Sequence, residues 1–387
     1  MDTIQQGLIA LIKSAVTQAP QPLPAGFDLE AAYPVICSHQ IYTLAFEGAV
    51  LSGISTDLSI MKKLFQIYCK ALVVTEGQLR QMGRVLDAFR EAGIHYMPLK
   101  GYNMRPRYPK PELRMMGDTD ILIRMDQYDQ VAAIMEGFGF VFKEEADHCM
   151  VWMRPGNTVE IHRRVVPKTD RDFYTYFGSG WKFSSGQLEY CHGMSPEDEF
   201  VYMFAHFTKH YRDGGIGCRH VTDLWVFRQI CPDLDEAQVK RKLQKLGLAE
   251  FYNNCCRLMD VWFEDGISDS VTEYMTQYLF YSGAYGTAET HRMSEALRNA
   301  GGVPTGFRGK LGFIWNLAFP KLSIMKAEYP LLQKIPVLLP VFWLWRLFDK
   351  MIIQKKSLHD HQQMLSQLST DNLASRETAL RYVGLKR

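Results

Sequence analysis

Apolar residues recur at helical spacing through most of the first 90 positions. The clearest run covers 55–89, where leucine, isoleucine, valine and methionine return every three or four residues. It follows Ser55, Thr56 and Asp57, which are residue types that favour a helix start, and it stops at Gly93. The pattern predicts one long amphipathic helix or two consecutive helices.

Short β-prone runs replace this pattern after Gly93. Residues 94–99 and 117–123 are predicted to be strands, and 126–137 a helix. Three further strands, at 140–142, 149–153 and 158–162, complete a small sheet. Pro155, Gly156 and Asn157 supply turn residues for a hairpin between the last two strands.

Helical patterns dominate again from Ser195, which precedes Pro196 and two acidic residues and so favours a helix start before 199–209. Further helices are predicted at 221–230, 235–246, 248–263, 271–281 and 340–353. The chain is therefore expected to belong to the α+β class. We expect a helical N-terminal segment at 1–84, an α/β core at 85–190 and a mostly helical C-terminal region at 191–387.

The composition argues against some kinds of binding partner. The 387 residues include 44 Lys and Arg and 42 Asp and Glu, which leaves a formal net charge of +2. This balance argues against a general nucleic-acid binder, and 47% hydrophobic content argues against long disorder. The eight cysteines form no C-x-x-C motif, which is typical of buried or indifferent thiols in a reducing compartment.

No targeting or spanning segment is expected. Asp2 stands where a signal peptide carries positive charge, and the apolar stretch 335–348 is short and contains Pro336 and Pro340. A cytoplasmic location is the prediction. The apolar residues 331–346 are followed by Lys350 and more lysines, so contact with a membrane surface is an alternative. A packing helix is the favoured interpretation.

The sharpest chemical feature is Asp118-Thr119-Asp120, which leads into an apolar strand. Side chains two apart on a strand share a face, so the two carboxylates should lie close together. Like charges at that distance need a raised pKa or a cation, and hard oxygen ligands suit Mg²⁺. Two solvated acids at a strand end are the alternative explanation.

Other residues are consistent with a site for metal ions and phosphate. Glu160 is a third acid on another predicted strand, and three carboxylates can hold two metals for phosphoryl transfer. Lys100 and Gly101 lie where a strand meets a turn, so the ammonium and the backbone N–H groups could bind phosphate oxygens.

An ordered set of motifs spans about 90–230. The motifs are Pro98-Leu99-Lys100-Gly101, Tyr108-Pro109-Lys110-Pro111-Glu112-Leu113-Arg114, Met116-Gly117-Asp118-Thr119-Asp120-Ile121-Leu122-Ile123, Gly137-Phe138-Gly139-Phe140, His148, Val159-Glu160-Ile161-His162, Ser195-Pro196-Glu197-Asp198, His206, His210 and Asp223-Leu224. This set resembles the uncharacterised nucleotidyltransferase family of the DNA polymerase β superfamily. The resemblance implies a mixed-sheet, polymerase β-like nucleotidyltransferase core.

The resemblance also implies roles. Asp118 and Asp120 would bind metal and Glu160 would be the third carboxylate, with Mg²⁺ as the expected ion and Mn²⁺ as the alternative. The superfamily commonly has Gly-Ser or Gly-Gly in place of Lys100-Gly101, so the lysine would replace a hydroxyl contact to the triphosphate. Glu160 stands where relatives commonly have Asp.

Several other residues are secondary candidates for the functional site. Arg114 could bind a phosphate or brace the carboxylates, or it could be a surface arginine. His206 and His210 share a helix face and, with His162, could line a cleft or be core histidines; a zinc site is the less favoured alternative. Asp223 could orient His220 or cap a neighbour.

The predicted function is transfer of an NMP from an NTP to a hydroxyl acceptor by a two-metal mechanism, with loss of pyrophosphate. Asp118, Asp120 and Glu160 would be catalytic, and Lys100, Gly101 and Arg114 would bind the nucleotide. A small molecule or a protein is favoured over nucleic acid as the acceptor. The main alternative is a non-catalytic nucleotide- or partner-binding module with the same fold, and a histidine-based metallohydrolase is a third.

Overall fold

The computed structural model describes residues 1–186, 189–286, 331–348 and 370–385, together with Phe319, Leu322, Met325 and Tyr329. The chain forms two compact units. The first comprises Met1–Lys209 and Ile216–Ala284, and it contains every strand described here. The second comprises His210–Gly215 and Tyr285–Arg387.

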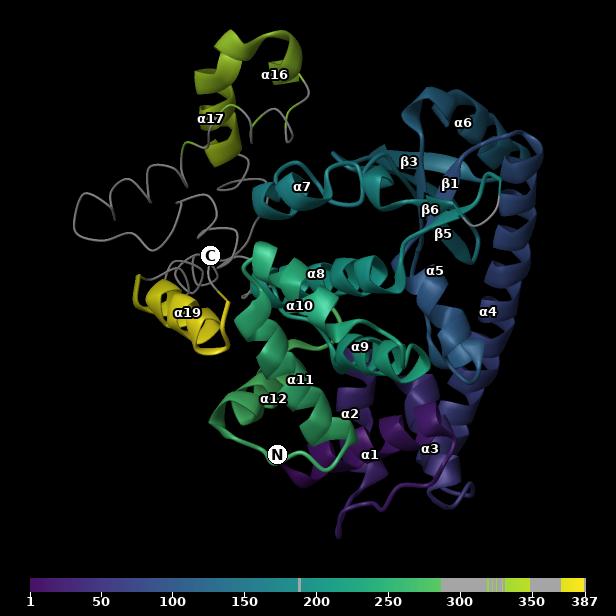
Figure 1. The fold of residues 1–387 in the computed structure, drawn as a ribbon, viewed down its shortest axis with the longest axis vertical. Coiled ribbons are helices and arrows are strands. Elements are labelled where there is room, and N and C mark those ends of the chain that lie inside the picture. Colours follow the sequence, from purple (N-terminus) through teal and green to yellow (C-terminus); the bar gives the residue numbers. More distant parts are fainter. Residues whose placement is uncertain are drawn as a thin grey trace. The chain divides into compact units, whose positions relative to one another are not determined.

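Four helices open the first unit, as the apolar spacing predicts: α1 (Thr3–Thr17), α2 (Leu29–His39), α3 (Tyr42–Leu51) and α4 (Ser59–Glu91). Residues 59–91 form a single helix, which answers the choice between one helix and two. Asp2 caps α1, because its side chain accepts a hydrogen bond from the Gln5 amide and the Gln5 side chain accepts one from the Asp2 amide. In Figure 1, α4 runs along one side of the unit beside the strands.

The sheet has five strands in the order β1-β2-β5-β4-β3. β2 and β5 are parallel, and the other neighbours are antiparallel, so the sheet is mixed. The predicted hairpin joins β4 and β5, where Arg154 pairs with Asn157. The strands are β1 (Tyr96–Pro98), β2 (Thr119–Ile123), β3 (Val141–Glu145), β4 (Cys149–Arg154) and β5 (Asn157–His162).

The two faces of the sheet differ in chemistry because side chains alternate along each strand. Ile121, Ile123, Val159 and Ile161 belong to a buried cluster that also contains apolar residues of α4 and of α6 (Tyr128–Gly137). Asp120, Glu160 and His162 therefore point to the opposite face, away from this cluster. The apolar face fixes the register, and the register places the polar side chains.

The remaining elements mostly follow the prediction. A short helix, α5 (Lys100–Met104), stands where the sequence predicts a turn, and α7 (Arg171–Phe177) was not predicted. The small pair β6 (Ser185–Gly186) and β7 (His192–Gly193) precedes the helical part. The helices there are α8 (Pro196–Asp213), α9 (Cys218–Ile230), α10 (Glu236–Lys245), α11 (Ala249–Phe263), α12 (Ser270–Ser282), α16 (Leu331–Lys334), α17 (Leu339–Phe348) and α19 (Thr370–Tyr382).

Short 3₁₀ helices link several of these elements, at Arg105–Arg107, Pro111–Leu113, Met125–Gln127, Trp181–Phe183 and Pro336–Leu338. The α+β prediction is confirmed. The end of the predicted helix at 340–353 and its lysines Lys350, Lys355 and Lys356 lie outside the described residues. Over the described part of the chain, no helix combines the length and the apolar character that a membrane crossing requires.

Candidate active site

The parallel pairing of β2 with β5 brings two acidic residues together. Asp120 lies opposite Glu160 in the ladder, and Leu122 lies opposite His162. The sequence separates the two acids by 40 residues, but the register places them side by side on the polar face of the sheet. Two of the three predicted carboxylates are thus neighbours in space.

Positive groups surround Asp120. Lys100 Nζ donates to Asp120 Oδ1 over 2.8 Å, and His162 Nε2 donates to the same oxygen over 2.8 Å. Asp120 is buried, and burial alone would raise its pKa, but Lys100 and His162 hold it well below its ordinary value. Burial also lowers the pKa of Lys100, yet the Asp120 charge outweighs this and raises it. The pair is therefore ionised at neutral pH.

His162 connects the two acids. Its Nε2 also lies 3.2 Å from Glu160 Oε2, and its ring is fully buried. Burial lowers the pKa of His162, but its hydrogen bonds to Asp120 and Glu160 raise it above its ordinary value. The hydrogen bond from His162 lowers the pKa of Glu160 despite the burial of that carboxyl. His162 thus stabilises both carboxylates in their charged form.

Asp118 directly precedes β2 and is exposed. Partial desolvation by the surrounding protein and the negative charge of Asp120 raise the pKa of Asp118, although the positive charge of Lys100 opposes this. The exposure of Asp118 makes it the most accessible of the three acids to a ligand from solvent. Its direct participation in binding metal stays a prediction.

Lys100 and Gly101 lie at the start of α5, just after β1. Lys100 has φ of 45°, a left-handed conformation that is uncommon outside glycine and often marks a functional position. A Cβ atom on Gly101 would lie 3.2 Å from Met116 Sδ and 3.3 Å from Arg114 Nη1. The glycine therefore lets the start of α5 pack closely against the segment that leads to Asp118.

Arg114 is buried and faces a partner that the sequence did not assign to it. Its Nε and Nη2 donate to the two carboxylate oxygens of Asp223, each over 2.9 Å. The Tyr108 hydroxyl donates to the same carboxylate over 2.8 Å. Arg114 and Arg219 also both donate to the carbonyl oxygen of Met115, over 3.1 Å. Arg114 is thus no surface arginine: it fixes the segment before Asp118, and its binding to a nucleotide stays a prediction.

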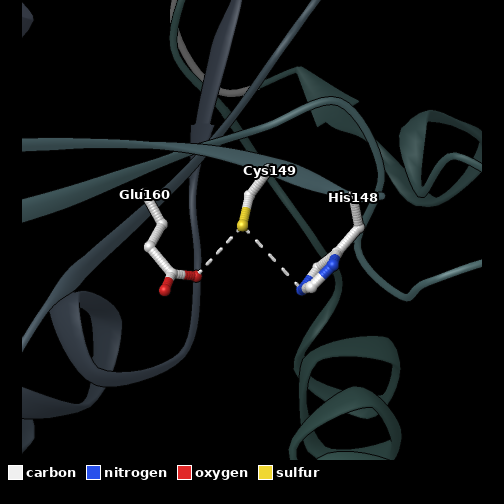
Figure 2. Close-up of side chains that lie close together, drawn as sticks. All are labelled: His148, Cys149 and Glu160. Carbon is white, nitrogen blue, oxygen red and sulfur yellow. Dashed lines mark hydrogen bonds between the residues drawn. The ribbon is translucent and has the colours of Figure 1, made fainter. Parts of the chain in front are cut away.

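A further group of possible ligands lies beside Glu160. Cys149 Sγ is 3.6 Å from Glu160 Oε2 and 4.0 Å from His148 Nε2 (Figure 2). Burial, followed by the charge of Glu160, raises the pKa of the Cys149 thiol to about 12. Burial and the nearby His162 lower the pKa of His148 to about 4. Both groups are therefore neutral at neutral pH.

The two histidines predicted to share a helix face, His206 and His210, both lie on α8. His206 is on α8, and its ring centroid is 6.4 Å from that of His220 on α9. The two groups of potential metal ligands found among the described residues are His148, Cys149 and Glu160, and Asp120, Glu160 and His162. Neither contains His206 or His210, so their place in a cleft stays a prediction.

Sequence reasoning missed Cys149, and for Asp223 it offered His220 or a helix cap rather than Arg114 as the partner. A signal for Cys149 was present, because a hairpin turn at Gly156 sets Cys149 opposite His162 on the same face. No local pattern marks the contact of Asp223 with Arg114, because 109 residues separate the two.

The donor chemistry fits a divalent cation. Asp120 and Glu160 offer carboxylate oxygens that lie within 4.8 Å of each other. Carboxylates are the hard oxygen ligands that Mg²⁺ and Mn²⁺ prefer, and Asp118 stands two residues before Asp120.

One comparison with known proteins identifies a family. A family model described as an uncharacterised nucleotidyltransferase matches residues 25–264, which is more than half of the chain. The solution structure of the antibiotic-resistance factor ANT(2'')-Ia is similar over 43% of this chain and 90% of its own, with 14% identity and a TM-score of 0.34. That likeness is too distant to carry an argument. No curated protein matches the chain.

Proposed function

The chain belongs to the uncharacterised nucleotidyltransferase family, and we propose that it transfers the nucleoside monophosphate of an NTP to an acceptor hydroxyl, with release of pyrophosphate. The supporting observation is the pairing of Asp120 with Glu160 on one sheet face, with Lys100 Nζ 2.8 Å from Asp120. Carboxylates for a cation and an ammonium for phosphate therefore lie within one small site.

Asp118, Asp120 and Glu160 are the residues proposed to hold divalent cations, Mg²⁺ or Mn²⁺. When bound, such ions neutralise phosphate charge and stabilise the attacking and leaving oxygens. His162 keeps Asp120 and Glu160 ionised, as their lowered pKa values indicate, so both carboxylates stay ready for a cation. His162 is thus a positioning residue in this proposal.

The phosphates would be bound by Lys100 and Gly101, with Arg114 beside them. The Lys100 ammonium stays charged at neutral pH because Asp120 raises its pKa, so it can neutralise a phosphate oxygen. Glu160 is proposed to accept the proton of the acceptor hydroxyl, since its side chain is 24% exposed whereas that of Asp120 is 6% exposed. The remaining access to Glu160 suits a group that must meet a second substrate.

The acceptor is proposed to be a small molecule or a protein side chain. The net charge of +2 argues against a broad basic surface of the kind that binds a nucleic-acid backbone. The alternative of a non-catalytic module predicts nucleotide binding without transfer.

Two measurements test the proposal. Isothermal titration should show that each NTP binds more tightly in the presence of Mg²⁺, and incubation of a lysate with α-labelled NTP should label an acceptor. Asp118→Asn should lower the labelling rate by about two orders of magnitude or more without loss of folding, because Asp118 is exposed. Asp129→Asn, an exposed acid in the first turn of α6, is the control and should match wild type.

Absence of Mg²⁺-dependent NTP binding by the wild-type protein would refute the proposal. Binding without label transfer to any lysate component would favour the non-catalytic module.

A further inference from the structure

Two donor atoms on the polar face, those of Cys149 and His148, have no part in the proposed nucleotide transfer. Cys149 opens β4 and is 2% exposed, and its register partner is His162. Cys149 Sγ lies 3.6 Å from Glu160 Oε2 and 4.0 Å from His148 Nε2, and all three ligand atoms lie within 4.8 Å of one another. Figure 2 shows Cys149 on β4, Glu160 on the neighbouring β5 and His148 just before β4, with their side chains converging.

The two separations from the sulfur are close to the edges of a tetrahedral zinc site. With Zn–S near 2.3 Å and Zn–N or Zn–O near 2.0 Å, tetrahedral ligand atoms lie about 3.5 Å apart. The observed 3.6 Å from sulfur to oxygen is at that value, and the 4.0 Å from sulfur to nitrogen is slightly longer. We take this difference to be within the reach of the His148 side chain, which is only half-buried and precedes β4.

The ligand types select against Mg²⁺. Magnesium prefers oxygen ligands and octahedral geometry, whereas thiolate and imidazole ligands favour zinc. Cys149 and Glu160 lie on paired strands of the sheet, so their separation is set by the backbone register. The donor set is therefore preorganised for a softer ion than the neighbouring carboxylates favour.

We propose that His148, Cys149 and Glu160 form a Zn²⁺ site, with the fourth position open to water or to another ligand. Binding forms three coordinate bonds and displaces the thiol proton of Cys149 to the solvent, with no change of oxidation state. Three protein ligands and one open position are the arrangement of zinc sites that keep a place for water or substrate.

The site shares Glu160 with the cation site of the proposed function. Zn²⁺ at Cys149 would therefore occupy the carboxylate that we propose as the base for the acceptor, and it would inhibit transfer. That inhibition rests on the proposed function, but the zinc site itself does not. A test of the site must therefore be independent of activity.

Cobalt substitution provides that test, because Co²⁺ bound to a thiolate gives a sulfur-to-metal charge-transfer absorption that oxygen and nitrogen ligands do not. The reduced full-length protein is titrated with Co²⁺ in excess Mg²⁺. We expect one equivalent of cobalt to develop this absorption, together with the intense visible bands of a tetrahedral site, and one equivalent of Zn²⁺ to abolish both.

Variants locate the signal. Cys149→Ser should abolish the charge-transfer absorption, and His148→Gln should weaken cobalt binding by more than about tenfold, the scale of loss seen even for indirect partners of a metal. Cys69→Ser is the matched control, because Cys69 is exposed on α4 and could bind cobalt adventitiously. Circular dichroism checks that each variant folds, and His148→Gln decides the case if the buried Cys149→Ser variant does not.

No charge-transfer absorption in the wild type would overturn the zinc site, as would an absorption that is lost in Cys69→Ser. An absorption of full strength and affinity in His148→Gln would also overturn it. None of these outcomes depends on nucleotide transfer, so the site and the proposed function can fail separately.

Discussion

The ion pair between Arg114 and Asp223 is expected to stabilise the fold strongly, and Asp223→Asn tests this. The substitution keeps the size of the side chain but removes the charge that faces the guanidinium. Arg114 is then left buried, with 7% of its surface exposed, and with a neutral partner. The Tyr108 hydroxyl also loses a charged acceptor.

The size of the effect follows from the burial of the pair. Both hydrogen bonds between the side chains are 2.9 Å long, and the Asp223 side chain is 5% exposed. Loss of one partner of a buried pair costs about 3–5 kcal/mol of unfolding free energy. At about 2–4 °C per kcal/mol for a domain of this size, Tm should fall by about 6–20 °C.

Denaturant unfolding of the full chain measures the change, and a compensated variant separates charge from packing. Arg114→Met with Asp223→Leu and Tyr108→Phe removes every member of the buried network. Because no unpaired polar group remains among these side chains, this variant should regain most of the stability that Asp223→Asn loses. The reasoning is refuted if Asp223→Asn costs less than about 1 kcal/mol, or if the compensated variant is the least stable of the set.

Three other changes should act through different causes. Gly48→Ala should lower Tm markedly in thermal unfolding, because a Cβ there would lie 2.0 Å from the Leu11 carbonyl oxygen. Asp269→Ala should cost about 1 kcal/mol in denaturant unfolding through loss of the α12 cap. Burial lowers the pKa of His39, which contacts the Phe280 carbonyl, so the unfolded chain binds this proton more readily and stability should fall as pH drops below about 6.5. In His39→Gln, that part of the pH dependence should vanish.

The fold could be predicted from sequence where apolar spacing was strong. The apolar run within 117–123 predicts one strand and the apolar residues of 158–162 predict another, and the structure buries Ile121 and Ile161 together. The same spacing was less informative on α4, where Leu72 is 46% and Val73 is 71% exposed. Periodicity identifies the helix, but it does not say which apolar residues the rest of the chain covers.

The short helix α5 shows a different limit. Lys100 and Gly101 follow a strand, and this pair is typical of a turn. The structure continues into a helix at Lys100, whose left-handed backbone is accompanied by the ion pair with Asp120. The local conformation at Lys100 thus goes together with a contact to a residue 20 positions away, and the turn propensity of Lys100-Gly101 does not predict that contact.

Part of the candidate site could likewise be predicted from local sequence, and part could not. Alternation along one strand is enough to place Glu160 and His162 on one face, and the hairpin turn is enough to add Cys149, although sequence reasoning overlooked that signal. The pairing of Asp120 with Glu160 depends on parallel contact between strands that a helix and two other strands separate in the chain. The sequence suggests that three acids need positive charge, but it does not reveal that Lys100 and His162 supply some of it.

The positive charge of Lys100 beside Asp120 affects how ligands would bind under the proposed function. Lys100 pairs with Asp120, so a nucleotide phosphate that takes the ammonium leaves the carboxylate with less positive charge around it. A divalent cation that binds Asp120 repels the ammonium and favours its move to phosphate. Each ligand thus improves the site for the other, which by linkage is a coupling between nucleotide and cation binding. We therefore expect the two to bind together more tightly than either binds alone, and Lys100→Met should reduce this coupling because it removes the Lys100–Asp120 ion pair that both ligands have to break.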